Sequence, residues 1–173
     1  MKTALILFAA AIGAFAQQNF DFKQLDKLGA NATGSTNITL EGDTLKLATS
    51  FLGDDNSAFR NLTGVYVRSF EFARPGQYKE ADLAPLRAYL KTLQWTKVVD
   101  VKEPDETSEI YVHALPNNKL GGLAIVSAEA KEVTVVFIAG SLNLSDVGKL
   151  SGLGIPDIKL DHDGKKSGDP KKD

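Results

Sequence analysis

Residues 65–72 are rich in β-branched and aromatic side chains and end before a Pro-Gly turn, but their apolar and polar positions do not simply alternate. This composition and these boundaries are typical of a strand. Successive residues of a strand point to opposite faces, so Val67 is expected on one face and Phe70 and Phe72 on the other. The pattern therefore predicts either a strand that is buried on both faces or a β-bulge near Arg68.

A helix is predicted after this turn, because leucines recur there at spacings of three and four residues. Asp82 is a suitable N-cap for it, and Pro85 falls in the first turn, where its missing N–H loses no hydrogen bond. The only tryptophan, Trp95, follows the helix and is expected to fill the join between helix and sheet. The leucines that form the apolar stripe are Leu83, Leu86, Leu90 and Leu93.

The chain before residue 65 is predicted to contain two short helices and one strand. Residues 20–28 have the spacing of an amphipathic helix, and residues 37–40 have the composition of a short strand. A second helix, capped by Asp43 or Thr44, is expected to continue to Leu52.

The chain after Trp95 is predicted to form only strands until about residue 139. Short polar connections separate four segments of strand length, and short connections require antiparallel neighbours. A four-strand meander follows from residues 98–102, 109–115, 120–127 and 132–139. Gly140 and Ser141 are expected to interrupt the last strand, before a final helix that begins at Asn143 or Ser145.

The predicted fold is α+β, with an antiparallel sheet of about five or six strands and helices packed mainly on one face. A single interior is expected, in which Ile125 lies together with residues of the first strand and helix. The side chains assigned to this structural core are Phe70, Phe72, Leu86, Leu90, Trp95, Ile125, Val135 and Phe137.

The two ends of the chain have the character of a leader and a tail. Residues 1–16 combine a basic start, an apolar run and an A-x-A motif at Ala14 and Ala16, which together predict a signal peptide and its cleavage site. Residues 156–173 are polar and aperiodic, so a disordered tail is expected. Residues 17–155 are then a single α+β domain.

Composition narrows the classes of function. The 173 residues contain no cysteine, which excludes disulfides, a thiolate nucleophile and a lipid-modified N-terminal cysteine. The predicted product is therefore an exported, soluble protein of the periplasm or the medium, without an integral membrane segment after cleavage. The net charge of −2 argues against nucleic-acid binding, which needs a concentrated basic patch.

Candidate catalytic and metal-binding residues are few. His113 and His162 have no partners at ligand spacing, so neither a metal nor a cofactor is predicted. Neither a nucleophile elbow nor a phosphate-binding glycine loop occurs. We expect solvated charges at hairpin ends, rather than a glycosidase pair, for the carboxylates Asp105, Glu106, Glu109, Glu129 and Glu132.

The arginines are unevenly distributed, because all four lie between residues 60 and 87. The planar guanidinium suits carboxylate or phosphate recognition, so Arg68, Arg74 and Arg87 are candidates for binding an anionic partner. Local salt bridges are the alternative interpretation.

Three segments carry a family likeness: VYVRSFEFARPGQY, DLAPLRAYL before Trp95, and GGLAIVSAEAKEVTVVFIAGSL. With their order, they resemble the exported bacterial proteins catalogued as domain of unknown function 4252. The resemblance covers residues 20 to 150 and implies a small envelope protein. Many members resemble lipoproteins, and this chain departs from those because it lacks the cysteine. The resemblance supplies no catalytic residues.

The function that these observations favour is a non-enzymatic binding or accessory module of the bacterial cell envelope, whose partner is a protein or another envelope component. It would act through a sheet face, a groove between sheet and helices, or an exposed edge strand. One alternative is a hydrolase or ligand-binding enzyme that uses carboxylates and arginines converging in three dimensions. A second is a structural subunit of an envelope assembly.

Overall fold

The computed structural model describes residues 20–50, 61–116 and 119–142. The predicted signal peptide with its cleavage site, the final helix, the polar tail and the end of the second helix lie outside these residues. The helical segments are η1 (Phe22–Leu25), α1 (Asp26–Asn31), α2 (Gly42–Ser50), η3 (Glu80–Leu83) and α3 (Ala84–Thr92). The strands are β1 (Gly34–Glu41), β2 (Leu62–Glu71), β3 (Thr96–Lys102), β4 (Glu106–Leu115), β5 (Lys119–Glu129) and β6 (Glu132–Leu142).

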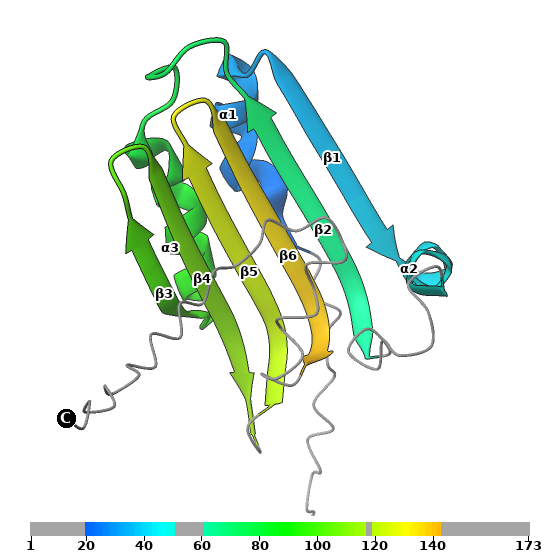
Figure 1. The fold of residues 1–173 in the computed structure, drawn as a ribbon. Coiled ribbons are helices and arrows are strands. Elements are labelled where there is room, and N and C mark those ends of the chain that lie inside the picture. Colours follow the sequence, from blue (N-terminus) through cyan, green and yellow to red (C-terminus); the bar gives the residue numbers. More distant parts are fainter. Residues whose placement is uncertain (1–19, 51–60, 117–118, 143–173) are drawn as a thin grey trace, which may run out of the picture.

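One antiparallel sheet of six strands forms the centre of the structure, in the order β1-β2-β6-β5-β4-β3. The four C-terminal strands are the expected meander, and β2 joins them by pairing with β6. Figure 1 shows α1 and α3 together on one face of the sheet. The predicted α+β class is confirmed. Helices α1 and α3 share one face as expected, whereas Leu45 of α2 joins a cluster on the other face.

Strand β2 is buried on both faces, as one of the two sequence interpretations required. Val65 and Tyr66 are adjacent in the chain and both buried, so they point to opposite sides. The alternative bulge near Arg68 is wrong, because the pairing with β1 and β6 is regular there. The register instead shifts between Leu62 and Gly64.

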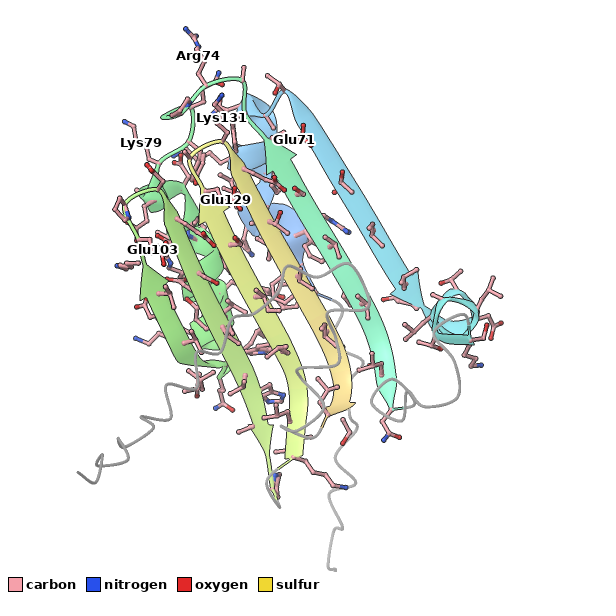
Figure 2. The ribbon with its side chains drawn as sticks, viewed as in Figure 1. Glu71, Arg74, Lys79, Glu103, Glu129 and Lys131 are labelled. Carbon is pink, nitrogen blue, oxygen red and sulfur yellow. The ribbon has the colours of Figure 1, made fainter. Side chains whose placement is uncertain are left out.

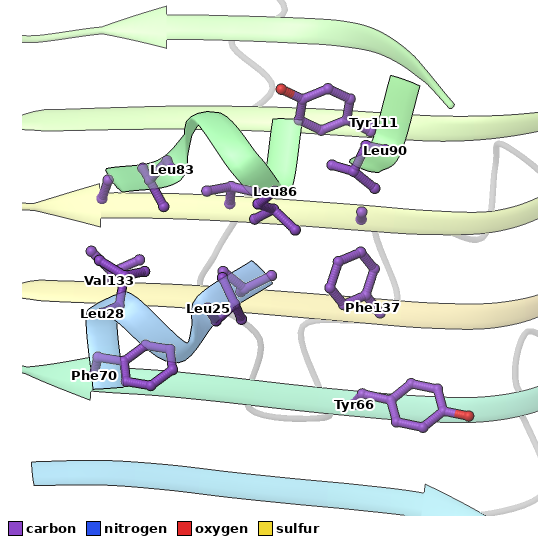
Figure 3. Close-up of a cluster of buried hydrophobic side chains, with 14 of the residues drawn as sticks. Leu25, Leu28, Tyr66, Phe70, Leu83, Leu86, Leu90, Tyr111, Val133 and Phe137 are labelled. Atoms are coloured by element: carbon purple, nitrogen blue, oxygen red, sulfur yellow. The ribbon is translucent and has the colours of Figure 1, made fainter. Parts of the chain in front are cut away.

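The helix-covered face carries the larger apolar cluster, which Figure 3 shows in close-up. Leucines of the η1–α1 and η3–α3 segments lie over aromatic and β-branched residues of the central strands. Phe137 is almost fully buried, and Trp95 packs edge-on against it with ring centroids 6.2 Å apart. Other members of this cluster are Leu25, Leu28, Tyr66, Phe70, Phe72, Leu83, Leu86, Leu90, Tyr111, Val133 and Val135.

The opposite face of the sheet carries a second apolar cluster, which includes Val65, Leu123, Ile125 and Leu45 of α2. The expectation of a single interior is therefore wrong. Successive residues of a strand point to opposite faces, so Ile125 lies on the side away from the helix-covered cluster, although it is buried.

Two local expectations are also corrected. Asp82 does not cap α3 but lies in the preceding η3 turn, where its carboxylate accepts the backbone N–H of Lys79. Gly140 does not interrupt β6, which continues to Leu142. Its φ of 130° places it in a region that favours glycine, and it pairs with Leu62 where the register shifts, so the strand continues through the irregularity instead of ending.

Candidate binding site at the edge of the sheet

The two edge strands of the sheet differ in their protection against further pairing. Strand β3 carries Lys97, Asp100 and Lys102 and has a register shift between Lys97 and Val99. Charges and bulges are the usual features that prevent an edge strand from pairing with another chain. Strand β1 pairs with β2 over its whole length without a shift, and it has neither charge nor proline from Gly34 to Leu40.

The contacts of Glu41 and Arg68 indicate which backbone groups of β1 face outwards. The Thr44 hydroxyl accepts the backbone N–H of Glu41 and donates to its C=O, at 3.2 and 2.7 Å. Arg68 donates to the carbonyls of the paired residues Ile38 and Val67, which places both carbonyls between β1 and β2. Because the orientation alternates along an antiparallel strand, Ile38 faces inwards and Glu41 outwards.

The N–H and C=O groups that face outwards therefore belong to Ser35, Asn37 and Thr39. We call residues 34–39 the open edge of β1. Strand β1 itself ends at Glu41, immediately before α2 begins at Gly42 (Figure 1). Within the described residues no further strand lies beyond it.

A pocket of about 360 Å³ lies between the first helical segment and this end of the sheet. We call it the Arg68 pocket. Asn37 stands at its β1 side and is paired with Arg68 across the two strands, so the two side chains share the helix-covered face. The pocket is lined by Phe22, Leu25, Asp26, Gly29, Ala30, Asn37, Arg68 and Phe70.

The guanidinium of Arg68 is half-buried in this pocket. It lies 4.0 Å from the centroid of the Phe22 ring, and it donates to the carbonyls of Ile38 and Val67 at 2.8 Å and to Thr39 Oγ1 at 3.2 Å. A guanidinium has five N–H donors, so two have no partner among the described residues. Burial lowers the pKa of Arg68, and Tyr66 partly opposes this.

Arg68 also has no carboxylate partner in the part of the chain that is described. The carboxylates that form ion pairs there are those of Asp43, Glu80, Asp82, Asp100 and Glu109, and their cationic partners are lysines and Arg87 rather than Arg68. Asp26 lines the same pocket without pairing with Arg68. Hydrogen bonds therefore hold the guanidinium of Arg68 in place, but no described carboxylate neutralises its positive charge.

The other two candidate arginines lie elsewhere. Arg87 on α3 donates to Glu109 at 3.0 Å and to Glu80 at 3.3 Å, which is the local salt-bridge role. Arg74 is exposed in the loop between β2 and η3 and projects away from the sheet (Figure 2). The structure does not bring the three arginines into one site.

Glu109 is the buried polar residue that the sequence interpretation placed wrongly in solvent. Its side chain is 2 % exposed and accepts bonds from Arg87, from Tyr111 at 2.8 Å and from Lys97 at 3.1 Å. Burial alone would raise the pKa of Glu109, but these bonds outweigh it and lower the pKa. Burial and the bond to Glu109 raise the pKa of Tyr111 to about 12. The sequence did contain an indication of this burial, because Glu109 and Tyr111 are two residues apart and therefore share one face of β4.

The other hairpin-end acids behave largely as expected. Asp105, Glu106 and Glu129 are exposed at the turns of the sheet, whereas Glu132 is half-buried and accepts the Ser69 hydroxyl at 2.8 Å. Two open pockets of about 300 and 460 Å³ lie among these turns. Figure 2 shows Glu103 and Glu129 at the same end of the sheet as Lys79 and Lys131, so this end carries both signs of charge.

The described residues do not form a recognisable catalytic constellation. A general acid at neutral pH needs a raised pKa, whereas the bond from Lys27 lowers the pKa of Asp82 and the bonds to Glu109 lower its pKa. Within residues 20–50, 61–116 and 119–142, no group of three acidic or histidine side chains could hold a metal ion. His113 stacks on Trp95 instead, with ring centroids 5.9 Å apart.

Comparison with known proteins agrees with the family resemblance. No helix of the described chain has the length and apolar character needed to cross a bilayer. Neither the curated proteins nor the solved structures yielded a match. Residues 29–150 match the family described as "Domain of unknown function (DUF4252)". Since this match covers more than half of the 173 residues, the chain belongs to the DUF4252 family.

Proposed function

We propose that the protein is a non-enzymatic, exported binding module of the bacterial cell envelope. It binds an extended segment of a partner protein, which adds to the sheet as a strand beside β1. The observation that carries this proposal is the open edge of β1, which is regular, uncharged and free of proline. Strand addition to such an edge is a general mode of peptide recognition.

The backbone of the open edge provides part of the affinity. Ser35, Asn37 and Thr39 each offer one N–H and one C=O, which makes six possible hydrogen bonds. At about 0.5–1.5 kcal/mol each, these bonds contribute roughly 3–9 kcal/mol, and the ordering of the bound segment offsets much of that. Backbone pairing alone therefore gives weak binding, and side-chain contacts must select the partner.

Two further parts of the proposal are export and the absence of catalysis, and they are supported by the N-terminal residues and by the ion pairs of Glu109. The apolar run and A-x-A motif of residues 1–16 support export. The hydrolase alternative has less support, because Glu109 is buried and its hydrogen bonds from Arg87, Tyr111 and Lys97 lower its pKa, whereas a general acid needs a raised one. A structural subunit would use the same edge to bind a second copy of the chain.

Site-specific photo-crosslinking in the source bacterium tests the proposal. A benzophenone amino acid is placed at Thr36 of β1, whose side chain points away from the Arg68 pocket, and at Val98 of β3, which is 55 % exposed, as the matched edge control. Asn37→Pro then removes an outward N–H while the bonds between β1 and β2 remain. Asn37→Ala controls for loss of the side chain.

The proposal predicts a crosslink from Thr36 to an extended segment of another protein, which Asn37→Pro abolishes and Asn37→Ala retains. Thermal unfolding must show that the proline variant is folded. Equal crosslinking from both edges, or crosslinking that survives Asn37→Pro in the folded protein, contradicts strand addition. A crosslink to a second copy of this chain supports the structural subunit instead.

A further inference from the structure

The Arg68 pocket adjoins the open edge of β1, so a segment bound there reaches it. A strand added beside β1 lies about 4.8 Å beyond it and places one residue opposite Asn37. Cross-strand neighbours share a face, and Asn37 shares its face with Arg68. The side chain of that residue therefore lies at the mouth of the pocket.

Arg68 extends towards the incoming strand. Its guanidinium contacts Ile38 and Thr39 of β1, so the side chain extends from β2 as far as the edge strand. The Phe22 ring lies against the guanidinium from the helix side, with 4.0 Å between the guanidinium carbon and the ring centroid. A side chain of the length of aspartate or glutamate, entering opposite Asn37, is sufficient to meet it.

We infer that the segment bound at the open edge carries an acidic side chain, whose carboxylate binds the two remaining N–H donors of Arg68. This inference rests on the proposed function and names the chemistry of its partner. The planar fork of arginine matches a carboxylate in a bidentate contact, and such charge-assisted bonds are strong. Asn37 can add an amide N–H to the same oxygens.

Other features of the pocket favour a carboxylate over a phosphate group. Phe22 and Phe70 supply apolar walls, which limit the screening of the charge pair by water. Asp26 supplies a negative charge on the helical side. Its repulsion of a doubly charged phosphate is about twice its repulsion of a singly charged carboxylate.

Selection from a displayed library of random heptapeptides tests the inference and does not require the natural partner to be identified. The full chain without its leader is immobilised as wild type, Arg68→Gln and Asn37→Pro. We expect wild type to enrich strand-forming peptides with Asp or Glu at one fixed position. Arg68→Gln is expected to retain the strand-forming peptides but to lose the acidic preference, and Asn37→Pro is expected to lose both.

A second measurement leaves the protein unchanged, so that it does not depend on how a variant folds. The best enriched peptide is synthesised with its acidic residue and with the matching amide, and binding is measured by fluorescence anisotropy. Loss of one charge-assisted contact predicts at least about tenfold weaker binding of the amide peptide to wild type. Arg68→Gln should bind both peptides equally, and Arg68→Lys should fall between.

The outcomes separate the two proposals. Enriched strand-forming peptides without an acidic preference, or equal affinities for the acid and amide peptides, overturn the role of Arg68 and leave strand addition standing. Absence of any enrichment that depends on Asn37 overturns both. Sedimentation showing a dimer that Asn37→Pro dissociates identifies a second copy as the occupant and overturns the acidic-peptide partner.

Discussion

The role of Glu109 provides the sharpest test of how the structure is held together. Glu109→Gln keeps the size of the side chain but removes the charge that Arg87, Lys97 and Tyr111 bind. The glutamine oxygen can accept some of these bonds, but its amide N–H groups then face two cations. We expect the substitution to destabilise the fold although it leaves the volume of the core unchanged.

The size of the effect follows from the surroundings. Breaking a buried ion pair costs about 3–5 kcal/mol when the remaining charge has no other partner. Here Arg87 and Lys97 are 25 % and 33 % exposed and keep second carboxylate partners, Glu80 at 3.3 Å and Asp100 at 2.8 Å. We therefore expect a smaller loss of about 2–3 kcal/mol, because neither cation is left without a partner.

Urea unfolding followed by the fluorescence of Trp95 measures this loss, because the only tryptophan is buried in the helix-covered cluster. Glu103→Gln, at an exposed turn, is the matched control and should change stability by less than about 0.5 kcal/mol. Combining Glu109→Gln with Arg87→Gln in a double-mutant cycle should give a coupling of about 1 kcal/mol or more.

The result that refutes the reasoning is a Glu109→Gln protein as stable as wild type, or more stable, with the same dependence on urea. A gain in stability would indicate that Glu109 is held under strain for a function, as catalytic groups often are. It would also reopen the hydrolase alternative, which the bonds of Glu109 to its two cations now disfavour.

Three further predictions concern stability. Because the pKa of Glu109 is lower in the folded state, its charge stabilises the fold above about pH 5, and this stabilisation is lost as the pH falls through the folded-state pKa. Urea titrations at several acidic pH values should therefore show that the free energy of unfolding falls more steeply for wild type than for Glu109→Gln. Gly140→Ala should destabilise the fold by about 2–4 kcal/mol, because the new Cβ would lie 2.4 Å from a backbone carbonyl oxygen. Gly76→Ala should cost only about 1–2 kcal/mol, because Gly76 has a φ of 80° but open space around it. Equal melting temperatures of the two variants would contradict this prediction. Phe137→Ala should lower the free energy of unfolding by about 3–5 kcal/mol, because this side chain is almost fully buried. Leu47→Ala should lower it by less than about 0.5 kcal/mol, because Leu47 is 61 % exposed. Calorimetry measures both changes, and similar losses of stability would refute the assigned core.

The local pattern of the sequence was sufficient to identify most elements. The leucines of α3 and the β-branched runs of β5 and β6 are periodic over their own lengths, and short connections between strands leave only antiparallel pairing. The six-stranded α+β fold could be predicted for that reason. The family likeness of residues 29–150 could also be recognised from the order of these segments.

The local pattern fails where a residue's environment comes from distant parts of the chain. It predicts a solvated charge at Glu109, whose three partners come from α3, β3 and its own strand. It predicts the end of a strand at Gly140, although the φ of 130° fits the register shift against β2. It predicts a single interior that includes Ile125, because periodicity indicates burial without indicating the face.

The sequence by itself determined the elements, their antiparallel connections and the apolar residues that they bury, since these depend on neighbours a few residues apart. Only the tertiary structure decided that β1 is an edge strand and that Arg68 lies in a pocket beside it, with no carboxylate partner among the described residues. Strand order and register are set by pairing between segments that are far apart, here β2 with β6. The proposed binding site is made by that pairing, and for this reason it cannot be read from any one stretch of the chain.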